Sequence, residues 1–234
     1  MLKEIDLCPE HHKTRQPNGG CPFCLLKEDE LNTLKENITI IKYKKNETVF
    51  KQKTYVSNIL YIKDGLAKLY IEGSNGRNLI LKITSNGDFI GLTDMYNKGM
   101  HTFTAIALKE SEIFSFEVEA FKKMLEGNSQ FAKKILQWYC KNSEYIFNKL
   151  STLGTKQMHG RLADVILYLS GEEFEKTGVF NYLSRNDIAE LTGMSKENAI
   201  RLLTEFKNDG LIKVDGKDII INNIELLQKL SSIG

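Results

Sequence analysis

Residues 183–221 read LSRNDIAELTGMSKENAIRLLTEFKNDGLIKVDGKDIII, and this stretch decides the fold of the C-terminal part of the chain. Ser184 can cap a helix, with Asp187 three residues later where a carboxylate suits the helix dipole. Gly193 ends this helix, and Ser195 caps a second one over residues 196–208. The second helix is predicted to turn its apolar residues inward: Ala199, Ile200, Leu202, Leu203 and Phe206. Two short helices joined by a tight turn containing glycine predict a helix-turn-helix.

The residues after the second helix predict a β-hairpin. Gly210 ends the helix, and residues 211–214 and 218–221 are rich in β-branched side chains. Asp215-Gly216 lies between these runs, and Asp-Gly is a favoured two-residue hairpin turn. A hairpin directly after a helix-turn-helix is a wing.

A long helix is predicted upstream of this unit, over residues 128–153. Apolar side chains follow a 4-3-4-3 spacing typical of a coiled-coil seam. The seam consists of Ala132, Leu136, Tyr139, Ser143, Ile146, Leu150 and Leu153, and a second stripe alongside it holds Phe131, Ile135, Trp138 and Tyr145. A helix that is apolar on two sides can pack on its own domain and on a second copy, so the pattern favours a dimer over a monomer with one buried helix. Gly154 is a plausible hinge before a further helix over residues 157–169.

Residues 39–116 have a different texture, with short β-prone runs separated by turn residues such as Ser74-Asn75-Gly76 and Asn86-Gly87-Asp88. Many short strands at such spacing predict a sandwich or roll. The expected strands cover residues 39–43, 48–50, 60–63, 67–72, 79–84, 102–107 and 113–116, after a short helix over residues 27–37. The fold class is therefore α+β, with a jelly-roll-like double-stranded β-helix domain at residues 31–127. A Cys/His arm at 1–30 precedes it, and a dimerisation helix at 128–154 and a winged helix-turn-helix at 155–234 follow it.

Composition argues against a membrane-spanning or secreted protein but does not identify a function. The chain of 234 residues is 41% hydrophobic and 26% charged, and no apolar run reaches the ~18 residues that a membrane span needs. Residues 1–13 are too polar for a secretory signal, so we expect a cytoplasmic protein without membrane partners. From Thr155 onward, 10 basic residues face 12 acidic ones. DNA binding must therefore depend on a few well-placed side chains.

The order of roll, long helix and winged helix-turn-helix resembles the CRP/FNR family of transcription regulators, from about Leu31 to the C-terminus. Residues 183–221 match in register, and Asn86-Gly87-Asp88-Phe89-Ile90-Gly91 resembles the phosphate-cassette region of the family's cyclic-nucleotide-binding-like roll. The resemblance implies a homodimer that regulates transcription by placing two recognition helices in successive major grooves of a near-palindromic double-stranded DNA site. It also implies RNA polymerase as a partner.

The family's base-reading positions fall at the start of the second helix, on Lys196, Glu197, Asn198 and Arg201. Arginine can bind guanine O6 and N7 bidentately, and glutamate can accept from cytosine N4. Glu197 and Arg201 could instead form a surface ion pair four residues apart. Ser184 and Ser195 at the helix N-termini are candidate phosphate contacts. Lys213 and Lys217 on the wing could add to them.

The cAMP-binding branch of the family carries a glutamate and an arginine in its roll. Here the cassette reads Phe89-Ile90-Gly91-Leu92-Thr93-Asp94, and no arginine lies between Arg77 and Arg161. His101 stands where the arginine is expected. A phosphate would lose its strongest bidentate contact, so we expect no cAMP binding.

The cysteines suggest a redox or metal site instead. Cys8, Cys21 and Cys24 precede the roll, as in the redox-sensing branch of the family, whose arm holds an oxygen- or nitric-oxide-labile [4Fe–4S] cluster. That branch's fourth cysteine has no counterpart, which leaves Glu112 or Cys140 as the fourth ligand. A second reading is a tetrahedral zinc site completed by His11 or His12. The third has no metal, with Cys21-Pro-Phe-Cys24 as a dithiol switch.

Two further functions are weighed against a redox-responsive regulator. One is a regulator with a structural zinc arm that is constitutive or senses a small molecule other than cAMP. The other is a thiol–disulfide oxidoreductase built on Cys21-Pro-Phe-Cys24. That chemistry normally follows a strand in a βαβ unit, which this arm lacks, so we expect no enzyme.

Overall fold

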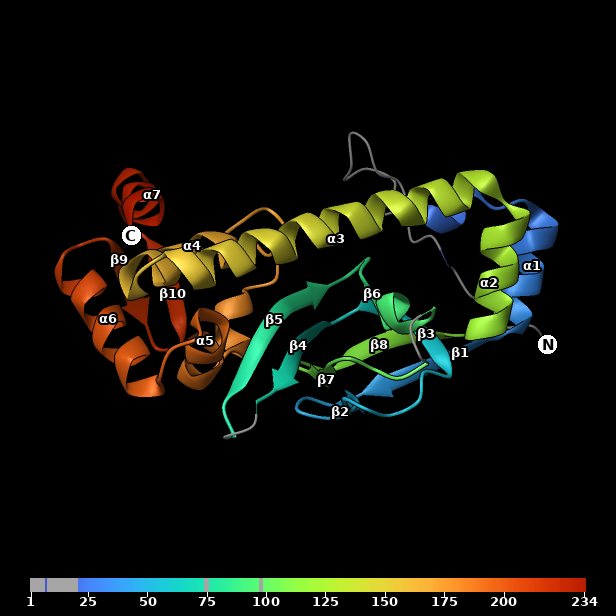
Figure 1. Ribbon diagram of the computed structural model, residues 1–234, viewed down its shortest axis with the longest axis horizontal. Helices are drawn as coiled ribbons and strands as arrows, with labels where there is room; N and C mark the ends of the chain where they lie inside the picture. The colour runs from blue at the N-terminus through green and yellow to red at the C-terminus, as the bar shows by residue number, and fades with distance from the viewer. Residues whose placement is uncertain (1–6, 8–20, 74–75, 97–98) are drawn as a thin grey trace.

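The computed structural model describes residues 7, 21–73, 76–96 and 99–234. Figure 1 shows an α+β chain in which a β-roll and a helical C-terminal unit lie along one long helix, α3. The roll, the long helix and the winged unit follow in the predicted order. None of the helices in these ranges combines the length and apolar character that crossing a membrane requires.

The roll consists of two four-stranded antiparallel sheets. In the first, the order is β1 (Ile38–Tyr43), β8 (Ser111–Glu117), β3 (Asn58–Asp64) and β6 (Phe89–Ile90). In the second, it is β2 (Thr48–Phe50), β7 (Thr104–Ala107), β4 (Leu66–Glu72) and β5 (Asn78–Ser85). The seven predicted strands are present, although β7 begins two residues later than expected. The two-residue strand β6 falls inside the cassette motif and was not predicted as a strand.

Helices enclose one end of the roll. The 3-10 helix η2 (Pro22–Leu25) and α1 (Glu28–Glu36) precede β1, and α2 (Val118–Gly127) follows β8. Asn128 then caps α3 (Ser129–Thr155), because its side-chain oxygen accepts from the backbone N–H groups of Gln130 and Phe131. The prediction of a hinge at Gly154 is wrong. Gly154 lies inside α3, and the chain leaves helical geometry at Lys156, whose ψ is 146°.

The second apolar stripe of α3 packs within its own chain, as predicted, on the roll over its first part and on Tyr168 of the C-terminal unit at Tyr145. Phe131 and Ile135 are buried in an aromatic cluster with Phe116, Phe121 and the η2 residue Phe23. The Phe121 and Phe131 rings meet edge to face at 5.6 Å, a favoured geometry for aromatic pairs. The N-terminal half of α3 is therefore fixed to the roll and to the described end of the cysteine arm.

The C-terminal unit is a winged helix-turn-helix with an added helix. Its elements are α4 (Met158–Leu169), the 3-10 helix η4 (Val179–Tyr182), α5 (Arg185–Thr192), α6 (Lys196–Asn208), β9 (Ile212–Asp215), β10 (Asp218–Ile221) and α7 (Ile224–Ile233). Helix α7, capped by Asn223, was not predicted. It lies against α4, where a Cβ on Gly160 would come within 2.8 Å of the Gly234 backbone, so Gly160 permits this approach.

The roll and the winged unit share a core. Leu66, Ile80, Ile83 and Leu108 from the roll join the cluster that fills the C-terminal unit. An ion pair crosses the same boundary, with Lys68 Nζ on β4 at 2.5 Å from Asp187 Oδ1 on α5. The winged unit is therefore held against the roll by both apolar and charged contacts.

Candidate DNA interface and sensor elements

The helix-turn-helix is fixed by local hydrogen bonds of the predicted kind. The backbone N–H of Ser184 donates to Asp187 Oδ2 at 2.7 Å, and the N–H of Asp187 donates to Ser184 Oγ at 3.1 Å, a reciprocal capping box. Gly193 has a φ of +64° and supplies the left-handed residue that ends α5. Ser195 accepts from the N–H of Asn198 at 3.3 Å and starts α6. These contacts fix the position of α6 relative to α5.

The first turns of α6 present polar side chains to solvent. Lys196, Glu197 and Arg201 are exposed, while Asn198 is half-buried. The Arg201 guanidinium lies 3.5 Å from Glu205 and forms no ion pair with Glu197. Hydrogen bonding to its own backbone N–H and to Ser195 holds the pKa of Glu197 below its ordinary value. Glu197 is therefore an ionised acceptor on this face, and Arg201 is tied only to a weak surface partner.

Ile200 corrects one sequence prediction. It was predicted to face inward, but 43% of the residue is exposed, whereas Ala199 and Leu202 on either side of it are buried. Ile200 lies between Glu197 and Arg201 on the outward face of α6. An exposed β-branched residue at this position is part of the candidate interface. The helical spacing already indicated this. At about 100° per residue, Ile200 lies about 160° around the helix from Leu202, so one inward face does not hold both.

The wing is held by an arginine that sequence reasoning missed. Arg185 at the start of α5 donates to the Gly216 carbonyl at 2.9 Å and to the Lys217 carbonyl at 3.4 Å. The strands pair Asp215 with Asp218, so the two-residue turn is Gly216-Lys217 and not Asp215-Gly216 as predicted. Gly216 supplies the positive φ, +59°, that such turns need. Lys213 and Lys217 remain exposed.

Ser184 and Ser195, the candidate phosphate contacts, differ in their exposure and in the hydrogen bonds that their hydroxyl groups already make. Ser184 is exposed, but its hydroxyl donates to Asp187 Oδ2 at 2.6 Å. Ser195 is half-buried and is engaged as the cap of α6. Their backbone positions at two helix N-termini remain suited to phosphate oxygens.

The predicted seam of α3 is uncovered within the chain. Leu136 and Leu150 are each 59% exposed and Tyr139 is 45% exposed. Ala132, Ser143, Ile146 and Leu153 are half-buried on the same helix. Large apolar side chains in a row on one face of a 27-residue helix form a contiguous surface that monomers rarely leave open.

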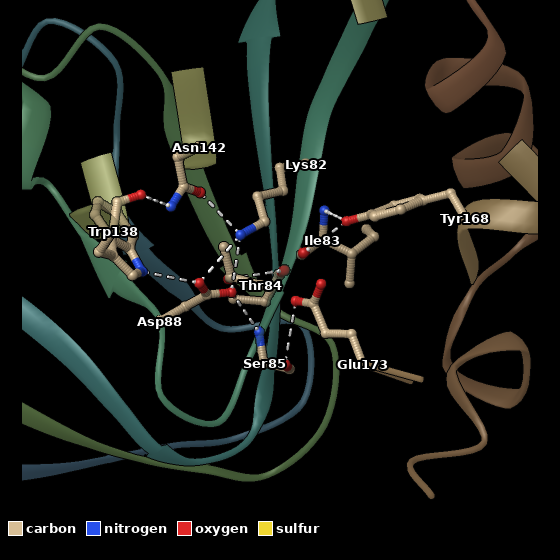
Figure 2. A network of polar contacts seen from close by, with 10 residues as sticks. Lys82, Ile83, Thr84, Ser85, Asp88, Trp138, Asn142, Tyr168 and Glu173 are labelled. Carbon is tan, nitrogen blue, oxygen red and sulfur yellow. Dashed lines mark hydrogen bonds and ion pairs between the residues drawn. The ribbon is translucent and has the colours of Figure 1, made fainter. Parts of the chain in front are cut away.

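A polar network joins the roll, α3 and the C-terminal unit (Figure 2). Lys82 Nζ on β5 donates to Asp88 Oδ1 at 3.0 Å and to Asn142 Oδ1 at 2.9 Å. Trp138 Nε1 donates to the same Asp88 oxygen at 3.3 Å. On the C-terminal side, the Tyr168 hydroxyl donates to the Ile83 carbonyl at 2.9 Å. We call this set the junction network, because a shift of α3 must change its contacts.

The roll carries a buried histidine and aspartate next to each other, His101 and Asp94. His101 is 6% exposed, its Nδ1 lies 3.4 Å from Asp94 Oδ2, and Asp94 is 1% exposed. Asp94 also accepts from the Thr102 hydroxyl at 2.9 Å. The His101 ring stacks on Phe50 with 3.6 Å between centroids. A cyclic phosphate placed here would face a buried carboxylate and an imidazole in place of a guanidinium.

The described part of the cysteine arm packs against the roll and α3. Cys21 is 5% exposed and its thiol donates to the Leu7 carbonyl at 3.4 Å. Cys24 is exposed and disulfide-bonded. Between them, Phe23 is fully buried, with its ring stacked on Phe116 at 5.4 Å. The arm is therefore in contact with the start of the long helix.

The candidate metal ligands do not come together within the described ranges. Glu112 forms an ion pair with Lys63 at 2.5 Å, and Cys140 is exposed on α3. Among the described residues, no group of three or more Cys, His, Asp or Glu side chains could hold a metal ion. Cys8, His11 and His12 lie outside those ranges. A cluster or zinc ion in this arm would therefore need at least one ligand from outside those ranges, in addition to Cys21 and Cys24.

Comparison with known proteins defines the class. The cyclic nucleotide-binding domain family matches residues 40–128, and the Crp-like helix-turn-helix domain family matches residues 160–230. A roll of the first kind joined by a long helix to a DNA-binding unit of the second kind defines a DNA-binding transcription regulator. The chain belongs to the CRP/FNR family.

The relatives are distant but extend along most of the chain. The cAMP-activated global transcriptional regulator CRP of Salmonella typhimurium is 23% identical over 186 residues, covering 78% of this chain and 89% of the relative. The CRP-like cAMP-activated global transcriptional regulator of Mycobacterium tuberculosis is 23% identical over 200 residues, covering 84% and 89%. FixK2 from Bradyrhizobium japonicum shares the fold with a TM-score of 0.74 at 21% identity, covering 84% of this chain and 98% of that one.

Proposed function

We propose that this protein is a homodimeric, redox-responsive transcription regulator that acts in the cytoplasm on near-palindromic DNA. The observation that carries the proposal is the outward face of α6. A capped, wing-supported helix presents Lys196, Glu197 and Arg201 to solvent. These side chains match the hydrogen-bonding groups that base pairs offer in the major groove. Lys213 and Lys217 on the wing would add phosphate contacts.

The uncovered seam of α3 supports the dimer. Pairing two seams would bury Leu136, Tyr139 and Leu150 and would set the spacing of the two α6 helices. Both half-sites are bound only if these helices lie about one DNA turn (~34 Å) apart. A signal that changes the packing of α3 would therefore change DNA affinity. RNA polymerase is the expected partner once the regulator is on DNA.

The sensor half supports a signal other than a cyclic nucleotide. The buried Asp94 carboxylate and the His101 imidazole do not fit a cyclic phosphate, because a buried anion needs a charged or multiply hydrogen-bonding partner. We propose that the roll does not hold cAMP.

The cysteine arm is the proposed redox element. Phe23 lies between Cys21 and Cys24 and contacts Phe131 of α3, with 6.1 Å between ring centroids. Asn128, the cap of α3, donates to the Leu25 carbonyl at 3.2 Å. A change in the arm would therefore reach α3 through Phe23 and Asn128. The disulfide at Cys24 does not involve Cys21, whose thiol donates to the Leu7 carbonyl, so a Cys21–Cys24 dithiol switch would need this pairing to exchange. An iron–sulfur cluster or zinc held with Cys8 and a histidine are the alternatives.

The first experiment is anaerobic purification of the full chain, followed by iron, zinc and acid-labile sulfide analysis and spectra before and after air. About four iron and four sulfide per chain, bleached by air, would support a cluster. Zinc alone would indicate a structural arm, and neither metal would favour the dithiol switch.

DNA binding is tested in parallel with a duplex selected by this protein from a random library. Oxidised and reduced protein are then compared on that duplex. Equal affinity in both states would contradict redox sensing, and failure to select any duplex would contradict the DNA-binding function.

A further inference from the structure

A cavity of about 300 Å³ lies where α3 gives way to the C-terminal unit. Its walls come from α3, α4, α5 and α7, and its lining includes Tyr145, Lys149, Leu153, Arg161, Tyr168 and Leu191. It is separate from the outward face of α6 and from the roll. The volume lies at the lower end of the range for small-molecule sites.

Two cations line this cavity without a carboxylate partner in the described part of the chain. Lys149 Nζ makes one hydrogen bond, to the Leu191 carbonyl at 2.8 Å. Arg161 makes one long contact, 3.4 Å to the Thr192 carbonyl, and its Nε is buried with no hydrogen-bond partner. Both carbonyls belong to the carboxyl end of α5, whose dipole favours cations. Most of the donors of the two side chains nevertheless stay unused.

Asp164, the carboxylate in the cavity lining, compensates the Lys149 charge only in part, because its attraction raises the pKa of Lys149 less than burial lowers it. Asp164 accepts from Lys156 at 2.8 Å, from the Thr152 hydroxyl at 2.7 Å, and from the Ser231 hydroxyl. Its acceptor positions are therefore occupied by other donors. Buried positive charge that is only partly compensated is costly, and burial lowers the pKa of Lys149 to about 8 despite the attraction of Asp164. Such a cost is retained where a ligand supplies the missing charge.

We propose that this cavity binds a small organic anion, with its carboxylate or phosphate on Lys149 and Arg161 and its apolar or aromatic body against Leu153, Leu191 and the rings of Tyr145 and Tyr168. The arginine offers a planar fork for two anionic oxygens, and the lysine offers a point charge beside it. The anion would be an effector, a role that rests on the proposed DNA-binding function.

The position of the cavity explains how occupancy would be transmitted. Tyr145 on α3 packs against Tyr168 on α4 with 4.9 Å between ring centroids, and Tyr168 belongs to the junction network (Figure 2). Lys149 and Arg161 hold the end of α5, from which the chain turns directly into α6. A bound anion would therefore contact the groups that position α6 relative to α3 and the roll.

Dimerisation would leave the cavity open. Tyr145, Lys149 and Thr152 each contact α4 or α5. Leu136 and Leu150 of the seam are exposed on another side of α3. Only Leu153 lies at the border of both surfaces.

The test uses 2-naphthoate as the probe and the neutral 2-naphthamide as a matched control, titrated into the full-length protein by calorimetry. We expect naphthoate to bind at least about tenfold more tightly than the amide, as one charge-assisted contact allows. Lys149→Met and Arg161→Gln should each abolish this preference. Lys141→Met, which removes an exposed cation from the same helix, should retain it.

The result that overturns the site is equal binding of acid and amide to the wild-type protein, or a preference that survives both substitutions. If the variants do not fold, the comparison of acid and amide on the wild-type protein, together with its pH profile, still tests the site. Naphthoate affinity should fall between pH 7 and pH 9.5 as Lys149 loses its proton, and a flat profile would contradict the proposal. Operator affinity is measured with and without naphthoate. If the protein does not bind the operator, the proposed DNA-binding function is contradicted. If it binds the operator but not naphthoate, only the anion site is contradicted.

Discussion

The winged unit and the roll differ in where they place their distinctive polar side chains: the winged unit exposes them, and the roll buries them. In the winged unit, the residues proposed to act lie on the outside of α6, and the motifs that position them lie within a few residues of them. In the roll, the chemically distinctive pair, His101 and Asp94, is buried, with His101 stacked on Phe50 of β2. An outward polar face suits a large ligand such as DNA, whereas a buried pair leaves no exposed charge for one.

The contrast indicates where the proposed signal would have to act. The roll and the winged unit share an apolar core, and α3 touches both. Because the winged unit is rigid, its DNA binding can be regulated only through the contacts that join it to the rest of the protein. These contacts are the seam of α3, the junction network and the hydrogen bonds at the end of α5.

The largest expected effect comes from breaking the seam. Leu150→Arg places a charge on the 59% exposed apolar face and should yield a monomer. Loss of the second half-site should weaken operator binding by roughly 100-fold or more, because linked sites gain about that factor. Sedimentation and fluorescence anisotropy would measure this. Gln137→Arg, exposed elsewhere on α3, is the matched control, and equal loss in both variants would contradict the assigned seam.

Removing one base-reading side chain should have the next largest effect. Arg201→Ala should weaken binding to the selected operator by about 2 kcal/mol and relax one base position, since a bidentate contact to guanine contributes about that much. Lys207→Ala, at the exposed end of the same helix, should lower affinity slightly and equally for all sequences. An operator affinity unaffected by Arg201→Ala would remove Arg201 from the interface.

Local sequence signals predicted the helix-turn-helix of the winged unit well. The caps at Ser184 and Ser195 and the end at Gly193 depend on neighbours within four residues, so the sequence contains all of their partners. Most of the errors arose at boundaries, and the other was the inward orientation predicted for Ile200. The hinge was assigned to Gly154 because glycine often ends helices, but no close contact or backbone strain forces a break there.

The features that sequence could not supply are long-range. The Lys68–Asp187 ion pair joins residues 119 positions apart, and the cavity at the end of α3 takes residues from four helices. Arg185 was missed because its partners are backbone carbonyls of the wing, which carry no sequence signature. The fold was therefore predictable from periodicity and caps, while the sensing elements depend on packing between distant segments.

A pH experiment distinguishes Lys149, which α3 places against the carboxyl end of α5, from an ordinary surface lysine. The folded pKa of Lys149, about 8, lies below its unfolded value near 10.4, so the cost of burying its charge is fully present below pH 8 and disappears toward pH 10. Lys149→Met should stabilise the protein by about 1.5 kcal/mol at pH 7, allowing for partial solvent screening. The advantage should shrink toward zero at pH 10. Urea unfolding of both proteins at each pH measures it, and a pH-independent difference would mean that Lys149 is not desolvated.

The smallest effect tests the one apolar residue on the reading face. Thymine carries the C5-methyl group that an exposed isoleucine can contact in the major groove. Replacing the thymines of the selected operator one at a time by deoxyuridine should, at one position in each half-site, weaken binding by about 0.8 kcal/mol, the value of one buried methyl group.

A double-mutant cycle assigns that methyl group to Ile200. In Ile200→Ala, the same thymine-to-uracil change should have no effect, because the partner is already absent. Lys196→Ala should leave the uracil effect intact. If every thymine tolerates the change in the wild-type protein, Ile200 faces the groove without reading it, and the specificity of α6 belongs to its charged residues alone.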